Sequence, residues 1–396
     1  MIWPLRRWLL LSGCTLNPPV AIICPDYPPR SGGVADYTAL LAAELVRHTP
    51  VQLITSTGTQ TPPAPITVQH VPDWQDEAAL FARLDALPPE TALLWEYVPH
   101  MYGRGGVAPV VPNLIRRLRT PGHCAQVVLA HEIAAPWSWL PNRAYYAWAH
   151  RRQWQEIVGW ADAIVTSTEA WRDEWQGKFP QHQTKFSYAA SPSTIPVASV
   201  PSITELRRSW RHQRGWEEDM LVLGWFGTAS AAKQLDWVFA AQKCAQTIGR
   251  PVALILIGKT EDIARAQNST LVQSTGYVDA ATVSHILQSI DLLLLPFIDG
   301  VSERRTSFMA GLAHGTPIAT TSGHNTGQTL RQANVCTLST AHDPEAFLKQ
   351  VMELMAAPDA RRAMGGRGRA HYQMHYDWPV VVGHLLQQLR REVDRK

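Results

Sequence analysis

The sequence is short of three things: cysteine, net charge and long apolar runs. Its five cysteines are scattered over 396 residues without a CxxC pair. This excludes a disulfide framework or a clustered zinc site and favours a reducing, cytoplasmic location. The formal charge of +3 comes without a basic block, so nothing in the composition supports nucleic-acid binding. Every apolar run falls short of the ~20 residues that cross a bilayer, so we expect no membrane-spanning helix.

The first residues form a segment of their own. MIWPLRRWLLLSGC contains two arginines, a short apolar run and the ending Leu11–Cys14, and in this it resembles a lipoprotein signal. Its apolar run is shorter than the core of an ordinary signal peptide. We therefore interpret residues 1–17 as an extension that precedes the first strand.

Strand-like and helix-like segments alternate through the rest of the chain. Apolar, β-rich runs lie at 20–24, 51–55, 92–97, 126–130 and 163–166, and again at 221–226, 252–257, 292–295 and 317–320. This alternation predicts an α/β protein of two doubly wound domains, at residues 18–195 and 200–375, each with a parallel sheet. A Ser-, Pro- and Ala-rich stretch, 187–205, is expected to join them. Such sheets bind ligands at the carboxyl ends of their strands, so a cleft between the domains is the expected site.

The segment from Asp291 to Thr321 is the most informative part of the chain. It predicts a buried strand, a polar loop, a helix that begins near Arg304, and a second buried strand. The amino end of a helix attracts anions, because its N–H groups lack partners there. Arg304 and Arg305 add guanidinium groups that suit phosphate. The segment therefore predicts a seat for a diphosphate.

Several motifs together resemble the group 1 (family 4) retaining glycosyltransferases of the GT-B fold. The resemblance covers residues from about 20 to 390. It is carried by PPRSGGVADYTALLAAEL, WEYVPHMYGRGG, GWFGTASAAKQLD, GYVDAATVSHILQSIDLLLLPF and SERRTSFMAGLAHGTPIATT. It implies two Rossmann-like domains facing across a cleft, the first for the acceptor and the second for a nucleotide-sugar. It also implies that a C-terminal helix, within 376–396, packs back on the first domain.

The resemblance also implies a role for individual residues. Catalytic roles, meaning contact with the transferred sugar or the leaving diphosphate, fall on His131, Lys233, Arg304 and Arg305. Donor binding falls on Gly32, Gly33, Gly227, Thr228, Tyr277, Val278, Glu303, Thr306 and Ser307. Acceptor binding falls on Glu132, Tyr97 and Tyr102. Each has a structural alternative: surface charge for the cations, a simple turn for the glycines, and packing for the aromatic residues and the histidine.

The chain departs from the pattern of common family members at three positions. Two glutamates eight residues apart are replaced by Ser302 and Ala310, and the arginine beside Gly227 is replaced by Thr228. These changes leave the donor sugar and base open. They also make a weak or inactive binding protein on the same fold, or an epimerase or hydrolase, the alternative hypotheses.

Tryptophan is abundant, with sixteen residues, seven of them between Trp137 and Trp175. We interpret this cluster as core or as sugar-stacking surface, with peripheral contact at the cytoplasmic face of a membrane as the alternative.

The sequence thus predicts a metal-independent hexosyltransferase without a cofactor. A UDP- or GDP-linked sugar would be the co-substrate, and a glycan, lipid or small molecule the acceptor. Catalysis would rest on holding the reacting atoms together and stabilising the departing diphosphate.

Overall fold

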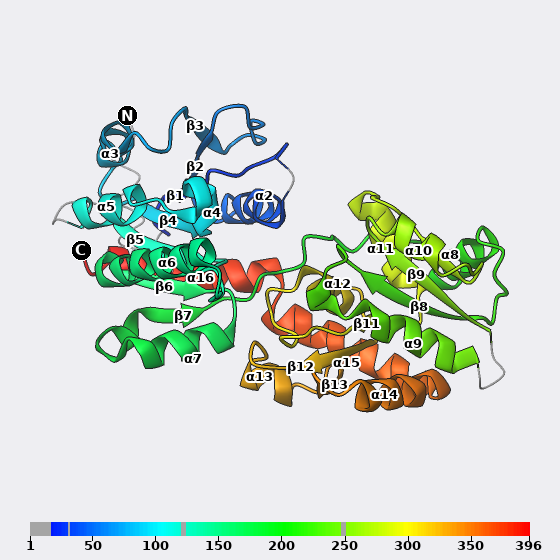
Figure 1. The fold of residues 1–396 in the computed structure, drawn as a ribbon. Helices are drawn as coiled ribbons and strands as arrows, with labels where there is room; N and C mark the ends of the chain where they lie inside the picture. The colour runs from blue at the N-terminus through cyan, green and yellow to red at the C-terminus, as the bar shows by residue number, and fades with distance from the viewer. Residues whose placement is uncertain (1–16, 31, 120–123, 247–250) are drawn as a thin grey trace. The chain divides into compact units, whose positions relative to one another are not determined.

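The computed structural model describes residues 17–30, 32–119, 124–246 and 251–396 (Figure 1). The expected extension at residues 1–17 therefore lies almost wholly outside the described residues. The chain divides into two compact units. The first comprises Met1–Ser167, Trp175–Ala189 and Val382–Lys396, and the second comprises Thr168–Glu174 and Ala190–Val381.

The first unit is built on a seven-stranded parallel sheet of order β3-β2-β1-β4-β5-β6-β7. Its strands are β1 (Val20–Ile23), β2 (Val51–Ser56), β3 (Thr67–Val71), β4 (Ala92–Tyr97), β5 (Ala125–Ala130), β6 (Ala163–Thr166) and β7 (Phe186–Tyr188). Its helical segments are α2 (Gly33–Leu45), α3 (Glu77–Asp85), α4 (Pro99–Tyr102), η2 (Arg104–Gly106), α5 (Val110–Arg117), α6 (Pro141–Trp160) and η3 (Pro180–Lys185). Because β1, β4 and β5 are buried along their whole length, they read as continuous apolar runs.

The second unit repeats this plan with a six-stranded parallel sheet of order β10-β9-β8-β11-β12-β13. Its strands are β8 (Leu221–Phe226), β9 (Val252–Ile257), β10 (Val272–Ser274), β11 (Leu292–Leu295), β12 (Ile318–Ser322) and β13 (Thr337–Thr340). Its helical segments are α8 (Ile203–His212), η4 (Ala231–Lys233), α9 (Leu235–Gln246), α10 (Glu261–Ala266), α11 (Ala280–Ser289), α12 (Thr306–Ala313), α13 (Gln328–Gln332), α14 (Pro344–Ala356) and α15 (Pro358–His375). The two units are thus both Rossmann-like, as the alternation predicts.

Two helices contribute residues to both units. The first turns of α7 (Glu169–Lys178) are grouped with the second unit and its remainder with the first. The last helix, α16 (Trp378–Val393), begins in the second unit and passes at Val382 into the first.

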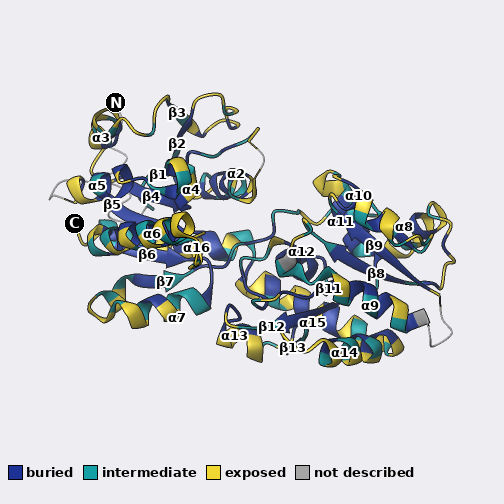
Figure 2. Ribbon diagram, in the orientation of Figure 1, coloured by how far each residue is buried: buried dark blue, intermediate teal, exposed yellow. Residues whose placement is uncertain are grey.

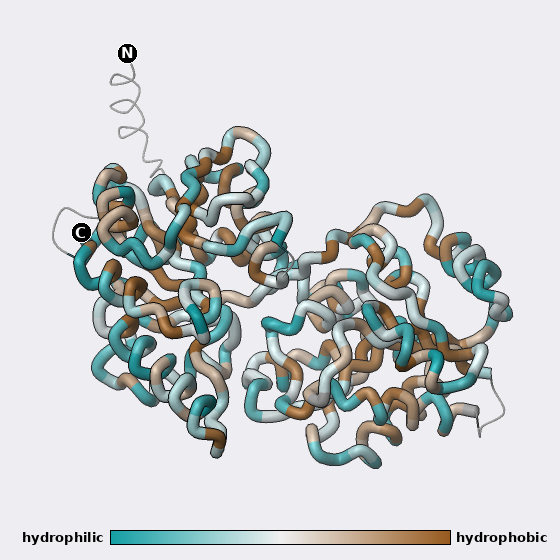
Figure 3. Tube along the Cα trace, turned by 45° about the horizontal axis from the view of Figure 1, so that its top comes forward, coloured by the Kyte–Doolittle hydropathy of each residue, from teal (hydrophilic) through white to brown (hydrophobic). Residues whose placement is uncertain are grey.

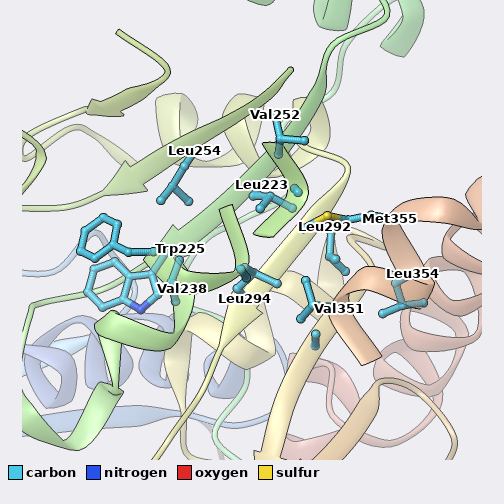
Figure 4. Close-up of a cluster of buried hydrophobic side chains, with 14 of the residues drawn as sticks. Leu223, Trp225, Val238, Val252, Leu254, Leu292, Leu294, Val351, Leu354 and Met355 are labelled. Atoms are coloured by element: carbon cyan, nitrogen blue, oxygen red, sulfur yellow. The ribbon is translucent and has the colours of Figure 1, made fainter. Parts of the chain in front are cut away.

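One hydrophobic core cluster of the second unit lies on the face of its sheet that α9 and α14 cover. Trp225 and Leu223 of β8 meet Val238 of α9 and Val351 of α14, all without solvent exposure (Figure 4). Hydrophobic segments run through both units, and buried residues follow the strands (Figures 2 and 3). Burying side chains of this size stabilises a fold by about 1.5–3 kcal/mol each.

One expectation about local structure is wrong. The joining segment does not begin at residue 187, because Ser187 and Tyr188 belong to β7 at the edge of the first sheet. The helix expected near Arg304 is present and begins at Thr306, with Arg305 as its N-cap, so both arginines precede it. Within the described residues, the structure contains no helix with the length and hydrophobicity needed to cross a membrane.

Candidate functional site

The strand order of the second unit points to the carboxyl ends of its central strands as the place where a ligand binds. The chain starts at β8, moves outward through β9 and β10, and returns to the other side of β8 at β11. Helices and loops after β8 and β11 therefore diverge at this point, which is where open α/β sheets bind ligands. The loops after these two strands also touch, since the Ile298 N–H donates to the Ala232 carbonyl at 3.0 Å.

Lys233 and Gly227 lie close together in the loop after β8. Gly227 has φ +144°, and a Cβ at that position would lie 2.1 Å from the Lys233 Nζ atom. A side chain at residue 227 would therefore both strain the backbone and displace the ammonium group. The glycine allows the lysine to fold back over the end of the strand, with Nζ 5.4 Å from the centre of the Trp225 ring.

The Lys233 ammonium is a cation without a counter-ion. Among the residues that the structure describes, no carboxylate or carbonyl forms an ion pair or hydrogen bond with it. Burial and, as a smaller cause, the nearby positive charge of Arg305 together lower the pKa of Lys233 to about 8. A partly buried cation of this kind is prepared to receive an anion, because the anion would relieve both effects.

Arg305 stands in the loop after β11, and an acidic side chain holds it there. Its Nη2 atom donates to both Asp299 carboxylate oxygens at 2.5 Å, and the Asn325 amide donates to the same carboxylate at 2.7 Å. The guanidinium carbon lies 4.6 Å from the centre of the Phe297 ring. Asp299 was not among the predicted site residues, because an ion pair six residues apart in an irregular loop leaves no periodic signal.

Arg304 and Glu303 occupy different environments from Arg305. The Arg304 guanidinium lies 4.6 Å from the centre of the Trp171 ring. Glu303 has no exposed surface, and its two carboxylate oxygens lack a hydrogen bond within the described structure. Burial raises the pKa of Glu303 to about 7, with a further contribution from the charge of Glu169. Glu303 is therefore a buried carboxyl group that is largely neutral below that pH.

The remaining predicted donor residues differ in how accessible they are. Tyr277 is 82% exposed, and Val278 beside it is half-buried. Thr306 is exposed at the first position of α12, whereas Ser307 is buried. Thr228 is exposed, beside the half-buried Gly227. Their contact with a donor stays a prediction.

In the first unit, a histidine and a glutamate are paired where β4 and β5 end. The Nε2 atom of His131 lies 2.5 Å from Oε2 of Glu96, a carboxylate with no exposed surface. The Tyr37 ring packs edge-on against the imidazole, with ring centres 4.7 Å apart. With Nε2 engaged, Nδ1 is the ring nitrogen left for a substrate. His131 and Glu96 are 35 residues apart, so sequence spacing gave no sign of this pair.

The glycines at the start of α2 adopt no backbone conformation that requires glycine, and their contact with a donor stays a prediction. Gly32 has φ 168°, which is extended backbone that any residue can adopt, and Gly33 begins the helix. Nothing lies within 4 Å of a Cβ built on either residue. What these glycines provide is open space at a helix start.

Two predicted acceptor residues are corrected by the structure. Tyr97 has no exposed surface, stacks on Trp154 and accepts a hydrogen bond from Gln153 at 2.8 Å. Tyr102 is buried as well, and its hydroxyl lies within hydrogen-bonding distance of the Ile23 and Glu96 carbonyls. Both are core residues, because Tyr97 of β4 packs against α6 and Tyr102 of α4 packs onto β1 and β4. Glu132, by contrast, is exposed.

A cavity of about 690 Å³ lies at the opposite edge of the second sheet. Leu221 and Val252, at the starts of β8 and β9, line it together with Arg207, Arg211 and Asp291. Its arginines already pair with Asp291, and it faces the amino ends of the strands. We therefore assign the candidate site to the carboxyl ends of the strands of the second sheet.

Known proteins share both the fold and part of the sequence. Residues 220–357 match the family described as "Glycosyl transferases group 1". The GDP-mannose-dependent monoacylated alpha-(1-6)-phosphatidylinositol monomannoside mannosyltransferase of Corynebacterium glutamicum is 21% identical over 393 residues, covering 94% of this chain and 97% of the relative.

Two solved structures illustrate the likeness of fold. WaaG, a glycosyltransferase involved in lipopolysaccharide biosynthesis, superposes with a TM-score of 0.63 at 16% identity, covering 93% of this chain and 99% of WaaG. HepE of Anabaena, in complex with UDP and glucose, superposes with a TM-score of 0.65 at 13% identity, covering 94% of this chain and 100% of HepE.

The chain therefore has the fold of the GT-B glycosyltransferases, built from two Rossmann-like α/β units. Residues 220–357, in its second unit, match the group 1 glycosyltransferase domain, and this match and the curated relative support the glycosyltransferase that the motifs predict.

Proposed function

We propose that the protein is a retaining glycosyltransferase that moves a sugar from a UDP- or GDP-linked donor to a glycan, lipid or small-molecule acceptor. The observation that carries this proposal is the Lys233 ammonium, half-buried without a counter-ion at the switch point of the second sheet and beside Arg305. A nucleoside diphosphate supplies the anion that this arrangement lacks.

The reaction needs charge stabilisation on the leaving group. The bond between the anomeric carbon and the diphosphate oxygen breaks, and the electron pair leaves with the diphosphate. The acceptor hydroxyl oxygen forms the new bond on the same face of the sugar, and its proton passes to the departing phosphate oxygen. Lys233 and Arg305 would stabilise the charge that develops, and loss of one such group typically costs about 100–1000-fold in rate. Because two side-chain cations are present, we propose that no metal or other cofactor takes part.

Arg305 would bind the donor by exchange of partners. In the structure its guanidinium is held by Asp299 at 2.5 Å. A guanidinium group has five N–H donors, so it can keep one contact with the carboxylate while others turn to a phosphate. Asp299 would thereby position Arg305, and Asn325 would keep Asp299 in place.

The donor base and the acceptor are finer parts of the proposal. The named relatives use or bind different nucleotides, GDP-mannose in one case and UDP in the other, so we include both classes. The exposed ring of Tyr277 would flank the base. We assign acceptor recognition to the first unit, with His131 and Glu132 as the side chains that contact sugar. We further propose that the enzyme works in the cytoplasm, where its acceptor is a carbohydrate or lipid-linked.

A thermal-shift screen tests the donor site, followed by product analysis. UDP, GDP, ADP and CDP and their sugars are each added to the wild type, to Lys233→Met and to Lys243→Met, a control in which an exposed lysine of α9 is replaced. A ligand at 100 times its dissociation constant adds about 2.7 kcal/mol to the stability of the folded state. We expect a shift with one nucleotide class, lost only in Lys233→Met, and transfer of the sugar to an added acceptor.

Other outcomes separate the alternatives. Binding with neither transfer nor hydrolysis would make the protein a nucleotide-sugar binding protein, and a changed sugar without an acceptor would make it an epimerase. The absence of any shift in a well-folded sample would overturn the donor-site assignment.

A further inference from the structure

The first unit carries a cluster of exposed aromatic and apolar side chains that the proposed reaction does not use. It lies on the loop before α6 and on the first half of that helix (Figure 2). Its members are Trp137, Trp139, Leu140, Tyr145 and Trp148, which are 61%, 103%, 53%, 53% and 56% exposed. We call these five residues the aromatic platform. Exposed apolar groups scattered singly are ordinary, but five within twelve residues mark an interaction surface.

The loop half of the platform is held in place by α6. The Arg151 guanidinium donates to the Ala135 carbonyl at 2.9 Å and to the Ala147 carbonyl at 2.8 Å. The same group lies 4.6 Å from the centre of the Trp137 ring. The Ala135 N–H donates to Nδ1 of His150 at 3.1 Å. The loop that carries the exposed Trp137 is therefore already ordered, so little conformational entropy is lost when a partner binds.

The helix half of the platform forms one stripe along α6. Tyr145, Trp148 and Arg152 follow one another at spacings of three and four residues, so they share one face. The rings of Tyr145 and Trp148 are 6.2 Å apart. The opposite face buries Ala147, Trp154 and Ile157 in the unit, so the stripe points away from the core.

Arginine is the predominant charged residue around the platform. Residues 133–155 include three arginines, Arg143, Arg151 and Arg152, and no aspartate or glutamate. Arg143 and Arg152 are exposed, and Arg152 is paired with Glu156 at 3.3 Å. Indole and phenol rings with arginines between them suit the boundary between lipid head groups and acyl chains, where one end of each ring is apolar and the other is wet.

We propose that the aromatic platform docks the protein on an anionic phospholipid membrane. Trp137, Trp139 and Trp148 enter the head-group region, and the neighbouring arginines bind lipid phosphates. A carbohydrate surface fits less well, because stacking on sugars does not call for arginines beside the rings. The proposal rests on the platform alone and stands whatever the donor proves to be.

Co-sedimentation with vesicles tests this docking. The full chain is mixed with vesicles of phosphatidylcholine alone and of phosphatidylcholine with phosphatidylglycerol. We expect binding to the anionic vesicles that weakens as salt rises, because exposed charges are then screened. The triple variant Trp137→Ser/Trp139→Ser/Trp148→Ser should partition at least about tenfold less strongly. The double variant Arg143→Gln/Arg152→Gln should keep residual binding that no longer depends on salt.

A matched control removes exposed apolar groups from the other unit. Ile203 and Met374 are 44% and 68% exposed, and the variant Ile203→Ser/Met374→Ser should bind vesicles like the wild type. Circular dichroism and thermal melting check that each variant is folded. Equal binding by the triple variant and the wild type would overturn the proposal. So would the absence of vesicle binding together with a dimer that the triple variant abolishes, since the platform would then join two copies of the chain.

Discussion

The activity should fall with rising pH because Lys233 must be charged to stabilise the leaving diphosphate. Burial and the neighbouring Arg305 lower the pKa of Lys233 to about 8. About 90% of the lysine is then cationic at pH 7 and about 10% at pH 9 in the free enzyme. We expect kcat/KM for the donor to fall roughly tenfold between these pH values, following one ionisation. The profile is measured by initial rates over this range at fixed ionic strength.

The variant Lys233→Arg provides the decisive comparison. A guanidinium group stays charged throughout this range, so the variant should have a lower but flat profile between about pH 7 and pH 9. The kcat of the wild type should depend less on pH than kcat/KM, since bound diphosphate raises the pKa of the lysine. A wild-type kcat/KM that stays constant up to pH 9 would refute the reasoning, as would a fall of equal size in Lys233→Arg.

Protein stability gives an independent check on the same group. The folded state binds fewer protons at Lys233 than the unfolded state does between about pH 8 and the ordinary lysine range. The contribution of this group to the free energy of unfolding therefore rises with pH in that window. As the pH rises, activity should therefore fall while the contribution of Lys233 to the free energy of unfolding does not. The difference in melting temperature between the wild type and Lys233→Met should move in favour of the wild type above about pH 8.

Three further changes test other parts of the site. Gly227→Ala should lower kcat/KM by about 100-fold, like loss of Lys233, because the added Cβ displaces the ammonium group; steady-state kinetics and a melting curve separate this from unfolding. Glu96→Gln should lower kcat by roughly 10–100-fold with little change in KM, because Glu96 orients His131; His131→Ala should lower kcat further, and an unchanged kcat in Glu96→Gln would contradict the positioning role. Glu303→Gln should stabilise the protein more at pH 8 than at pH 5, by at most about 3 kcal/mol. The reason is that burial raises the pKa of Glu303 to about 7, so the wild type loses stability as the pH rises towards and through this value. Chemical denaturation at both pH values measures the difference.

The sequence predicted the central strands well and the edge strands poorly. Strands such as Val252–Ile257 and Leu292–Leu295 are buried on both faces, so their apolar runs are continuous. The edge strands Thr67–Val71 and Thr337–Thr340 went unpredicted because they are partly exposed and polar, and their strand conformation comes from pairing with a neighbour. Tertiary pairing, which no local pattern encodes, decided these segments.

For the candidate site, the family resemblance identified residues but not their surroundings. The motif GWFGTASAAKQLD pointed to Lys233 as a cation after a strand, which is where the structure has it. The resemblance also implied that Tyr97 and Tyr102 bind the acceptor, yet both are buried, because exposure depends on tertiary packing. The Glu96–His131 contact joins neighbouring strands and becomes visible only once their order is known.

The structure also shows which cations stand near the position where common family members have an arginine and this chain has Thr228. Position 228 is threonine, so the loop after β8 offers Lys233 as its cation. The positive charge of Arg305 is felt by Lys233 strongly enough to lower its pKa, so the second cation comes from the loop after β11. Two adjacent cations repel each other, and the Asp299 carboxylate offsets this by pairing with Arg305 at 2.5 Å. A donor diphosphate would offset the same repulsion, and more fully, because it faces both cations. The pairing of Arg305 with Asp299 therefore stabilises the site while it is empty. The Lys233 ammonium, which has no counter-ion among the described residues, would then attract the donor diphosphate.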